Sequence, residues 1–176
     1  MITTLNSQKG LTLLELLIVL SIVSILLSTG VPSFRNAVMD SRMVDGSNAF
    51  ASSISAARSS AIRFQRQVTI CPIDDYEAAL LSCSNDTDWT TGWMVWVDQD
   101  RDGATTANEI LSTQQPLHAS LSFDSGAADD FTYDGRGFLI SGGDDLVVCD
   151  SRTGEEGRII RVNGIGRTSV ARQVCP

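Results

Sequence analysis

Four acidic residues in the middle of the chain have the spacing of a calcium-binding loop. The segment DQDRDGATTANE, residues 98–109, carries the predicted ligands Asp98, Asp100, Asp102 and Glu109. Calcium prefers oxygen ligands, and the pattern D-x-D-x-D-G-x5-E supplies them around a sharp turn. The alternative is a solvated acidic hairpin loop without a metal, because strands rather than helices are expected on both sides. Calcium apart, the sequence predicts no cofactor.

Basic side chains gather near the C-terminus, where they offer contacts for phosphate groups. The stretch GRIIRVNGIGRTSVAR contains Arg158, Arg161, Arg167 and Arg172. Residues 74–150 carry 16 acidic and two basic side chains, so this part of the chain repels polyanions. Residues an odd number apart on a strand point to opposite faces, which separates Arg158 from Arg161 and Arg167 from Arg172. Binding of DNA therefore competes with a second interpretation, in which the arginines offset the acidic middle.

No residue pattern of an enzyme active site occurs in the sequence. His118 is the only histidine, and no Cys or Ser motif supplies it with a nucleophilic partner. The sequence also contains no P-loop, no GxGxxG after a strand and no HExxH motif. We therefore expect a protein that is not an enzyme.

The chain has four cysteines, Cys71, Cys83, Cys149 and Cys175. An even number of cysteines after a membrane segment favours disulfides on the exported side. Three pairings are possible, and we favour the nearest-neighbour choice of Cys71 with Cys83 and Cys149 with Cys175. None of these pairs has CxxC spacing, so a zinc site is not expected.

A long apolar run with one carboxylate inside it lies near the N-terminus. Residues 11–31 are mostly Leu, Ile and Val, and as a helix they would extend about 31 Å, enough to cross a hydrocarbon core. Lys9 predicts that the preceding end stays in the cytoplasm. A secretory signal peptide is the competing interpretation, but it has a shorter core and a better cleavage site than Ser28-Thr29-Gly30. Glu15 is unusual here, because a carboxylate in lipid is tolerated only when it is paired or reaches the interface.

The acidic loop, the arginines, the cysteines and Glu15 are expected to be positioned by one long helix and a sheet. After Pro32 the helix is expected to continue to residue 66. Its apolar stripe consists of Phe50, Ile54, Ala57, Ala61 and Phe64, at helical spacing. From residue 67 onward, short apolar segments alternate with turn signals such as DRDG and SGGDD and predict strands. In the strand GWMVWVD we expect one of the two faces to lie in the core.

The predicted fold class is α+β. A long N-terminal helix, transmembrane over residues 11–31 and amphipathic over residues 32–66, packs on a mostly antiparallel β-sheet head at residues 67–176. Removal of the first sixty or so residues leaves enough chain for one core.

The segment KGLTLLE, followed by the apolar run, resembles the class III leader of type IV pilins and type II secretion pseudopilins. Three later segments resemble the minor pilin group of FimT, FimU and GspH, in the same order. These segments are ISAARSSAIRFQRQVTIC, GWMVWVDQDRDG with the following EIL, and DLVVCDSRTGEEGRIIRVNGIGRTSV. The resemblance spans nearly the whole chain and implies a pilin-like fold.

The resemblance implies that residues 1–10 are a leader peptide. A prepilin peptidase would cut between Gly10 and Leu11 and methylate the new N-terminus, although Leu stands where the family usually has Phe. Glu15 would then be the fifth mature residue and would pair with the free amine of Leu11 on a neighbouring subunit, which sets the axial register. Pro32 would be the helix-bending proline of pilins.

The implied location is the bacterial inner membrane, crossed once, with the head in the periplasm. The implied partners are other minor pilins or pseudopilins, the major pilin, the prepilin peptidase and membrane lipid. The implied function is to initiate or cap a type IV pilus or a type II secretion pseudopilus, which share leader, helix and head. A C-terminal GRxR motif of FimT proteins contributes to DNA uptake in natural transformation. Gly166 and Arg167 match this motif, but Ser169 replaces its second arginine, and DNA binding remains the alternative function.

Overall fold

The computed structural model describes residues 12–152, 154 and 156–175 of the chain. Two units, Met1–Val38 and Met39–Pro176, are distinguished by their internal contacts, and one helix, α1 (Leu13–Phe64), contributes to both. The predicted cleavage residues Gly10 and Leu11 lie outside the described residues.

In the first unit, α1 presents an apolar surface whose serine hydroxyls bond within the helix. The hydroxyls of Ser21, Ser24 and Ser28 each donate to the carbonyl three residues earlier, at 2.7, 2.9 and 2.8 Å. These side chains therefore need no water, which suits a helix that lies in lipid. Pro32 lies inside α1, and the helix continues through it although proline cannot donate to the preceding turn.

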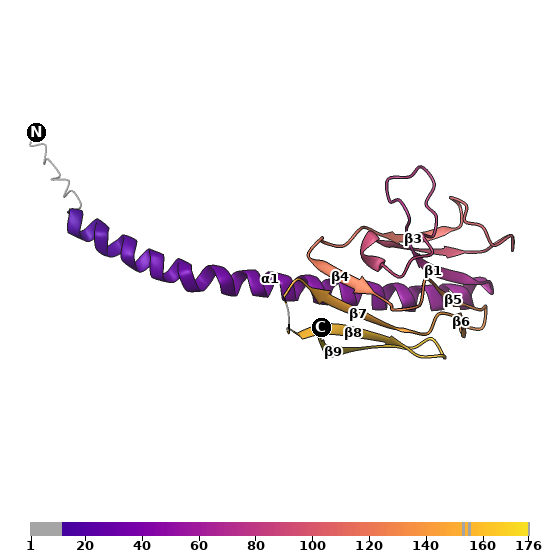
Figure 1. Ribbon diagram of the computed structural model, residues 1–176. Helices are drawn as coiled ribbons and strands as arrows, with labels where there is room; N and C mark the ends of the chain where they lie inside the picture. The colour runs from indigo at the N-terminus through magenta and orange to yellow at the C-terminus, as the bar shows by residue number, and fades with distance from the viewer. Residues whose placement is uncertain (1–11, 153, 155, 176) are drawn as a thin grey trace, which may run out of the picture. The chain divides into compact units, whose positions relative to one another are not determined.

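The second unit contains nine described strands in two antiparallel sheets (Figure 1). The first sheet has the order β3-β2-β1-β5-β6 and the second β4-β7-β8-β9. The strands of the first sheet are β1 (Val68–Pro72), β2 (Trp93–Val97), β3 (Ile110–Gln114), β5 (Phe131–Tyr133) and β6 (Leu139–Ser141), and a short 3-10 helix, η1 (Trp89–Thr91), precedes β2. Those of the second sheet are β4 (Leu121–Asp124), β7 (Asp145–Asp150), β8 (Glu156–Val162) and β9 (Thr168–Val174).

Residues 39–64 of α1 pack against both sheets through a single core. Phe50 lies at its centre, with edge-to-face contacts to Trp89, Trp93 and Phe123 at 5.0, 5.3 and 5.2 Å between ring centroids. Such contacts add to the free energy of burying the rings. The predicted stripe is confirmed for Phe50, Ile54, Ala57 and Ala61, which are fully buried. The prediction was wrong for Phe64, which ends the helix and keeps 36% of its surface exposed.

Strand β2 is buried along its whole length, on both faces. The face that carries Trp93 belongs to the main core. The opposite face, with Trp96, belongs to a second cluster under the loop that the Cys71–Cys83 disulfide closes. The sequence predicted that one face is buried. It gave no sign of the second buried face, because the loop that covers this face has no periodic pattern of its own. The predicted fold class, one long helix on antiparallel sheets, is confirmed.

Candidate functional site

Glu15 lies in the first turn of α1, and its backbone N–H donates to the Thr12 hydroxyl at 3.2 Å. A carboxylate at this end is favoured by the helix dipole, and a threonine is a common N-terminal cap. Among the described residues, Glu15 makes no ion pair. Its side chain is exposed on a helix whose neighbouring surface is apolar.

The apolar part of α1 exposes large hydrophobic side chains. Large side chains such as Leu13, Leu17 and Ile25 are more than half exposed. By length and composition, α1 is the helix among the described residues that could cross a membrane. Pro32 lies inside this helix, as the sequence predicts.

The acidic loop between β2 and β3 brings three of its four predicted ligands together. One carboxylate oxygen from each of Asp98, Asp100 and Asp102 lies within 4.8 Å of the others. The chain turns back at Gly103, which has a φ of 74° in the left-handed region that favours glycine. Asp98 Oδ1 is buried and accepts no hydrogen bond from a described residue.

Glu109, the fourth predicted ligand, is used differently. Its carboxylate accepts hydrogen bonds from the backbone N–H of Gln99, at 2.8 Å, and from the N–H and hydroxyl of Thr106, at 3.1 and 2.7 Å. These bonds, the Thr106 hydroxyl first, lower the pKa of Glu109. Glu109 therefore holds the loop closed, and calcium binding stays a prediction that would rest on the three aspartates.

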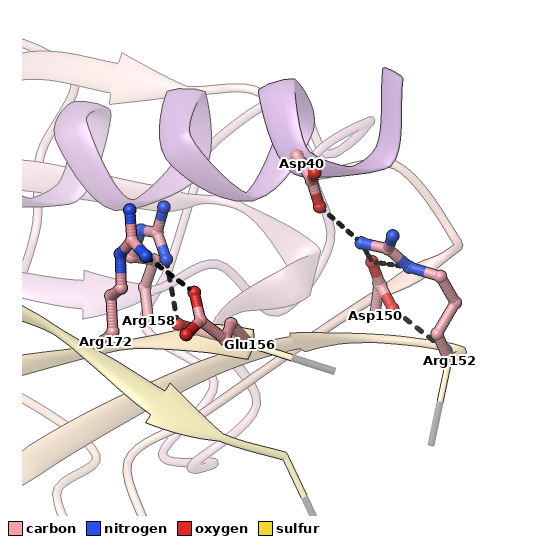
Figure 2. A network of polar contacts seen from close by, with 7 residues as sticks. Asp40, Asp150, Arg152, Glu156, Arg158 and Arg172 are labelled. Atoms are coloured by element: carbon pink, nitrogen blue, oxygen red, sulfur yellow. Dashed lines mark hydrogen bonds and ion pairs between the residues drawn. The ribbon is translucent and has the colours of Figure 1, made fainter. Parts of the chain in front are cut away.

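The C-terminal arginines divide between two faces of the second sheet. Arg158 on β8 and Arg172 on β9 are cross-strand partners, so they share one face (Figure 2). Arg172 Nη1 lies 2.9 Å from Glu156 Oε2, and Arg158 Nη1 donates to the Gly157 carbonyl at 3.1 Å. Arg161 points to the other face, where its Nε lies 3.3 Å from Asp145 Oδ2.

Arg167 belongs to the turn between β8 and β9 rather than to a strand. Its backbone N–H donates to Asn163 Oδ1 at 2.8 Å, and its side chain is exposed. With Arg58 and Ile62 of α1 it lines an open groove beside the turn. The four arginines named from the sequence therefore form no single cluster.

The cysteines are joined as Cys71–Cys83 and Cys149–Cys175, with S–S distances of 1.98 and 2.03 Å. The first bond closes the loop that covers Trp96. The second ties the end of β9 to β7 and lies over Gly157 of the strand between them.

Sequence reasoning missed a polar network that joins α1 to the second sheet (Figure 2). Arg152 Nη2 lies 2.6 Å from Asp150 Oδ2 and 2.6 Å from Asp40 Oδ1. The Asp150 side chain is 1% exposed, and its hydrogen bonds with Arg152 hold the pKa of its carboxyl below the ordinary range. The short spacing from Asp150 to Arg152 was a local signal, but no pattern points to Asp40.

His118 makes polar contacts with Ser120 and Arg42 and, in the described part of the chain, is not part of a catalytic arrangement of side chains. Its Nδ1 lies 2.9 Å from Ser120 Oγ and 3.1 Å from the Ser120 backbone nitrogen, and 3.2 Å from Arg42 Nη1. Both Ser120 contacts stabilise one exposed turn, and no carboxylate among the described residues orients the ring.

Comparison with known families identifies this combination of helix and head. A family model described as "Type II transport protein GspH" matches residues 46–166, and a prokaryotic N-terminal methylation motif matches residues 5–31. The chain belongs to the GspH family. Its members are pilin-like minor pilins or pseudopilins, structural components rather than enzymes. The methylation motif and the apolar helix together indicate a membrane anchor that precedes the head.

The fold of this GspH-family chain is similar to that of two crystal structures of the type IV minor pilin FimU from Pseudomonas aeruginosa strain PAO1. One matches with a TM-score of 0.56 at 18% identity and covers 81% of this chain and 91% of FimU. The other matches with a TM-score of 0.55 at 17% identity and covers 72% and 90%. At this identity the likeness establishes the pilin-like fold alone. No curated protein sequence matches the chain.

Proposed function

We propose that this GspH-family protein helps to initiate or cap a filament, either a type IV pilus or a type II secretion pseudopilus. A prepilin peptidase removes residues 1–10 and methylates Leu11. The processed chain waits in the bacterial inner membrane with its head in the periplasm, and it then joins other minor pilins or pseudopilins and the major pilin. The family description names type II transport and the FimU structures name a type IV pilin, so the proposal covers both filaments.

One observation supports this role above the others: Glu15 is a carboxylate without an ion pair among the described residues, in the first turn of an exposed apolar helix. In lipid such a group is costly unless a positive charge meets it. The methylated amine of Leu11 on an adjacent subunit provides that charge. Pairing of the two groups fixes how far one helix slides along the next, while the apolar surface supplies the packing.

Binding of DNA stays a prediction. The structure puts Arg161 on the opposite sheet face from Arg158 and Arg172, leaves Arg167 in a turn, and places acidic partners beside Arg161 and Arg172. We therefore assign the head to partner choice within the filament.

The role of Glu15 can be tested with two matched variants of the full chain. We expect Glu15→Ala to leave membrane insertion and leader cleavage intact, as judged by mass spectrometry, and to abolish recovery of the protein in sheared filaments. Ser24→Ala is the control, because it removes another polar group from the same helix without removing a charge, and it should be incorporated normally. Normal incorporation of Glu15→Ala would refute the proposal, and so would a native protein that retains residues 1–10.

A further inference from the structure

Strand β9 is an open edge of the second sheet. It pairs with β8 over seven residues, and no second strand lies beside it in the described part of the chain. Cys175 follows the strand directly, and its bond to Cys149 holds that end in place. The edge is therefore ordered before any partner arrives, which lowers the entropic cost of binding there.

The hydrogen bonds at the hairpin turn show which backbone groups face outward. Asn163 N–H donates to the Arg167 carbonyl at 3.0 Å, which makes these two a bonded pair. Bonded and non-bonded pairs alternate along an antiparallel ladder, so the register assigns Ser169, Ala171 and Gln173 to the bonds with β8. The residues between them, such as Val170 and Arg172, direct their N–H and C=O groups to the open edge.

This edge has exposed apolar side chains, and Arg172, whose side chain is 71% exposed, is its one charged residue. Val170 and Val174 are 42% and 66% exposed, and the strand contains no proline. Proteins commonly shield a long edge with a proline, a bulge or a covering loop, because unpaired strands attract other chains. An edge of seven residues with two exposed valines is thus suited to accept an added strand.

Charge identifies the kind of strand that fits. Arg172 points to the same face as Arg158, and among the described residues Arg172 has the Glu156 carboxylate as its ion-pair partner while Arg158 has none (Figure 2). A residue opposite Arg172 on an added strand would have its Cβ about 5 Å away. An acidic residue there would complete the pairing, with apolar residues opposite the valines.

A second copy of β9 does not meet this requirement. Residues 167–174 contain two arginines and no acid, so two β9 strands would bring like charges together. A second β9 strand therefore lacks the acidic residue that this edge calls for.

We propose that β9 is the docking edge for an extended acidic segment of another pilin-class subunit, which adds to the second sheet as its fifth strand. This proposal rests on the proposed function, since it presumes a complex of several different subunits. It deepens that function by naming the part of the head that selects a neighbour.

The test uses the full chain in detergent micelles and a short labelled peptide with the pattern Val-Thr-Glu-Thr-Val, which places one Glu between two Val side chains on the same strand face. We expect the peptide to bind saturably, as followed by fluorescence anisotropy, and the same peptide with Lys in place of Glu not to bind. Hydrogen exchange of the Val170 and Arg172 amides should be fast in the free protein and slow with peptide. The Ala171 and Gln173 amides should exchange slowly in both states. Slow exchange at Val170 in the free protein would overturn the proposal, because the edge would already be covered.

Two variants sharpen the test. Val170→Pro removes one outward N–H and no bond to β8, and it should weaken peptide binding about tenfold. Arg172→Glu should abolish binding of the acidic peptide and allow the Lys peptide to bind, and this result does not depend on how Val170→Pro folds. Gln173→Ala, whose backbone faces β8, should bind the acidic peptide normally.

Equal binding of both peptides, or no effect of either variant, would overturn the proposal. The proposal would also be overturned if the protein bound a DNA duplex but not the peptide, and if Arg172→Glu abolished the binding of DNA. That result would favour the nucleic-acid role. Glu15→Ala should bind the peptide normally. If Glu15→Ala is incorporated into filaments normally while the peptide still binds, the filament role alone is rejected. If Glu15→Ala is not incorporated but the wild-type protein does not bind the peptide, the docking edge alone is rejected.

Discussion

Arg152 Nη2 lies 2.6 Å from Asp40 Oδ1, which joins the end of β7 to α1 across 112 residues of sequence. The same guanidinium group neutralises the buried carboxylate of Asp150. Removal of the cation would leave a buried charge without a partner. We therefore expect Arg152→Ala to lower the free energy of unfolding of residues 39–176 by about 3 kcal/mol in urea. Arg136→Ala is the matched control: Arg136 is 81% exposed in its pair with Asp134, and its loss should cost less than about 1 kcal/mol. Equal effects of the two variants would contradict this account.

The Asp150 carboxyl also predicts how stability depends on pH. Hydrogen bonds with Arg152 lower its pKa in the folded state, so its contribution is complete above the ordinary aspartate value of about 4 and is lost as the pH falls through the lowered value. In Arg152→Ala the pKa of Asp150 should rise. The difference in the free energy of unfolding between wild type and Arg152→Ala should thus narrow as the pH falls from neutral to about 3. A difference that stays constant over this range would mean that Arg152 stabilises the head by packing alone.

Removal of either disulfide should lower the free energy of unfolding by a similar amount, but the two removals should differ in their effect on tryptophan fluorescence. Loop-closure entropy assigns each a stabilisation of about 3 kcal/mol, for sequence separations of 12 and 26. The Cys71→Ala/Cys83→Ala variant loosens the loop over Trp96, so its tryptophan fluorescence should shift to the red in the folded state. Cys149→Ala/Cys175→Ala should unfold at lower urea without that shift, because neither cysteine belongs to a core cluster that contains a tryptophan. A red shift in both variants would contradict the assignment of Trp96 to the second cluster.

Gly157 marks a close approach between strand and disulfide. A Cβ at this position would lie 2.5 Å from both Cys175 Sγ and the Val148 carbonyl oxygen. Gly157→Ala should therefore cost about 2 kcal/mol of stability through overpacking. Gly164→Ala, in the turn at the other end of β8 with no atom within 4 Å of the new Cβ, should change stability by less than about 0.5 kcal/mol. Thermal unfolding of both variants, with the disulfides verified intact, measures the difference.

The sequence by itself determined the parts of this protein that are local. The apolar run with Glu15 and Pro32, the helical stripe from Phe50 to Ala61 and the alternation of strands and turns all lie in short windows, where spacing alone specifies the structure. These patterns are sufficient for the fold class and for the family resemblance.

Only the tertiary structure decided which distant residues meet. Arg158 faces Arg172 because of the register of two strands, Asp40 meets Arg152 because α1 packs on the second sheet, and Trp96 is buried because a loop without periodic pattern folds over it. The position of Glu109 shows the same limit, since its place in the calcium pattern gave no indication that its oxygens bind the loop's own N–H groups. Contacts of this kind depend on how whole elements pack, and no single window of sequence contains that information.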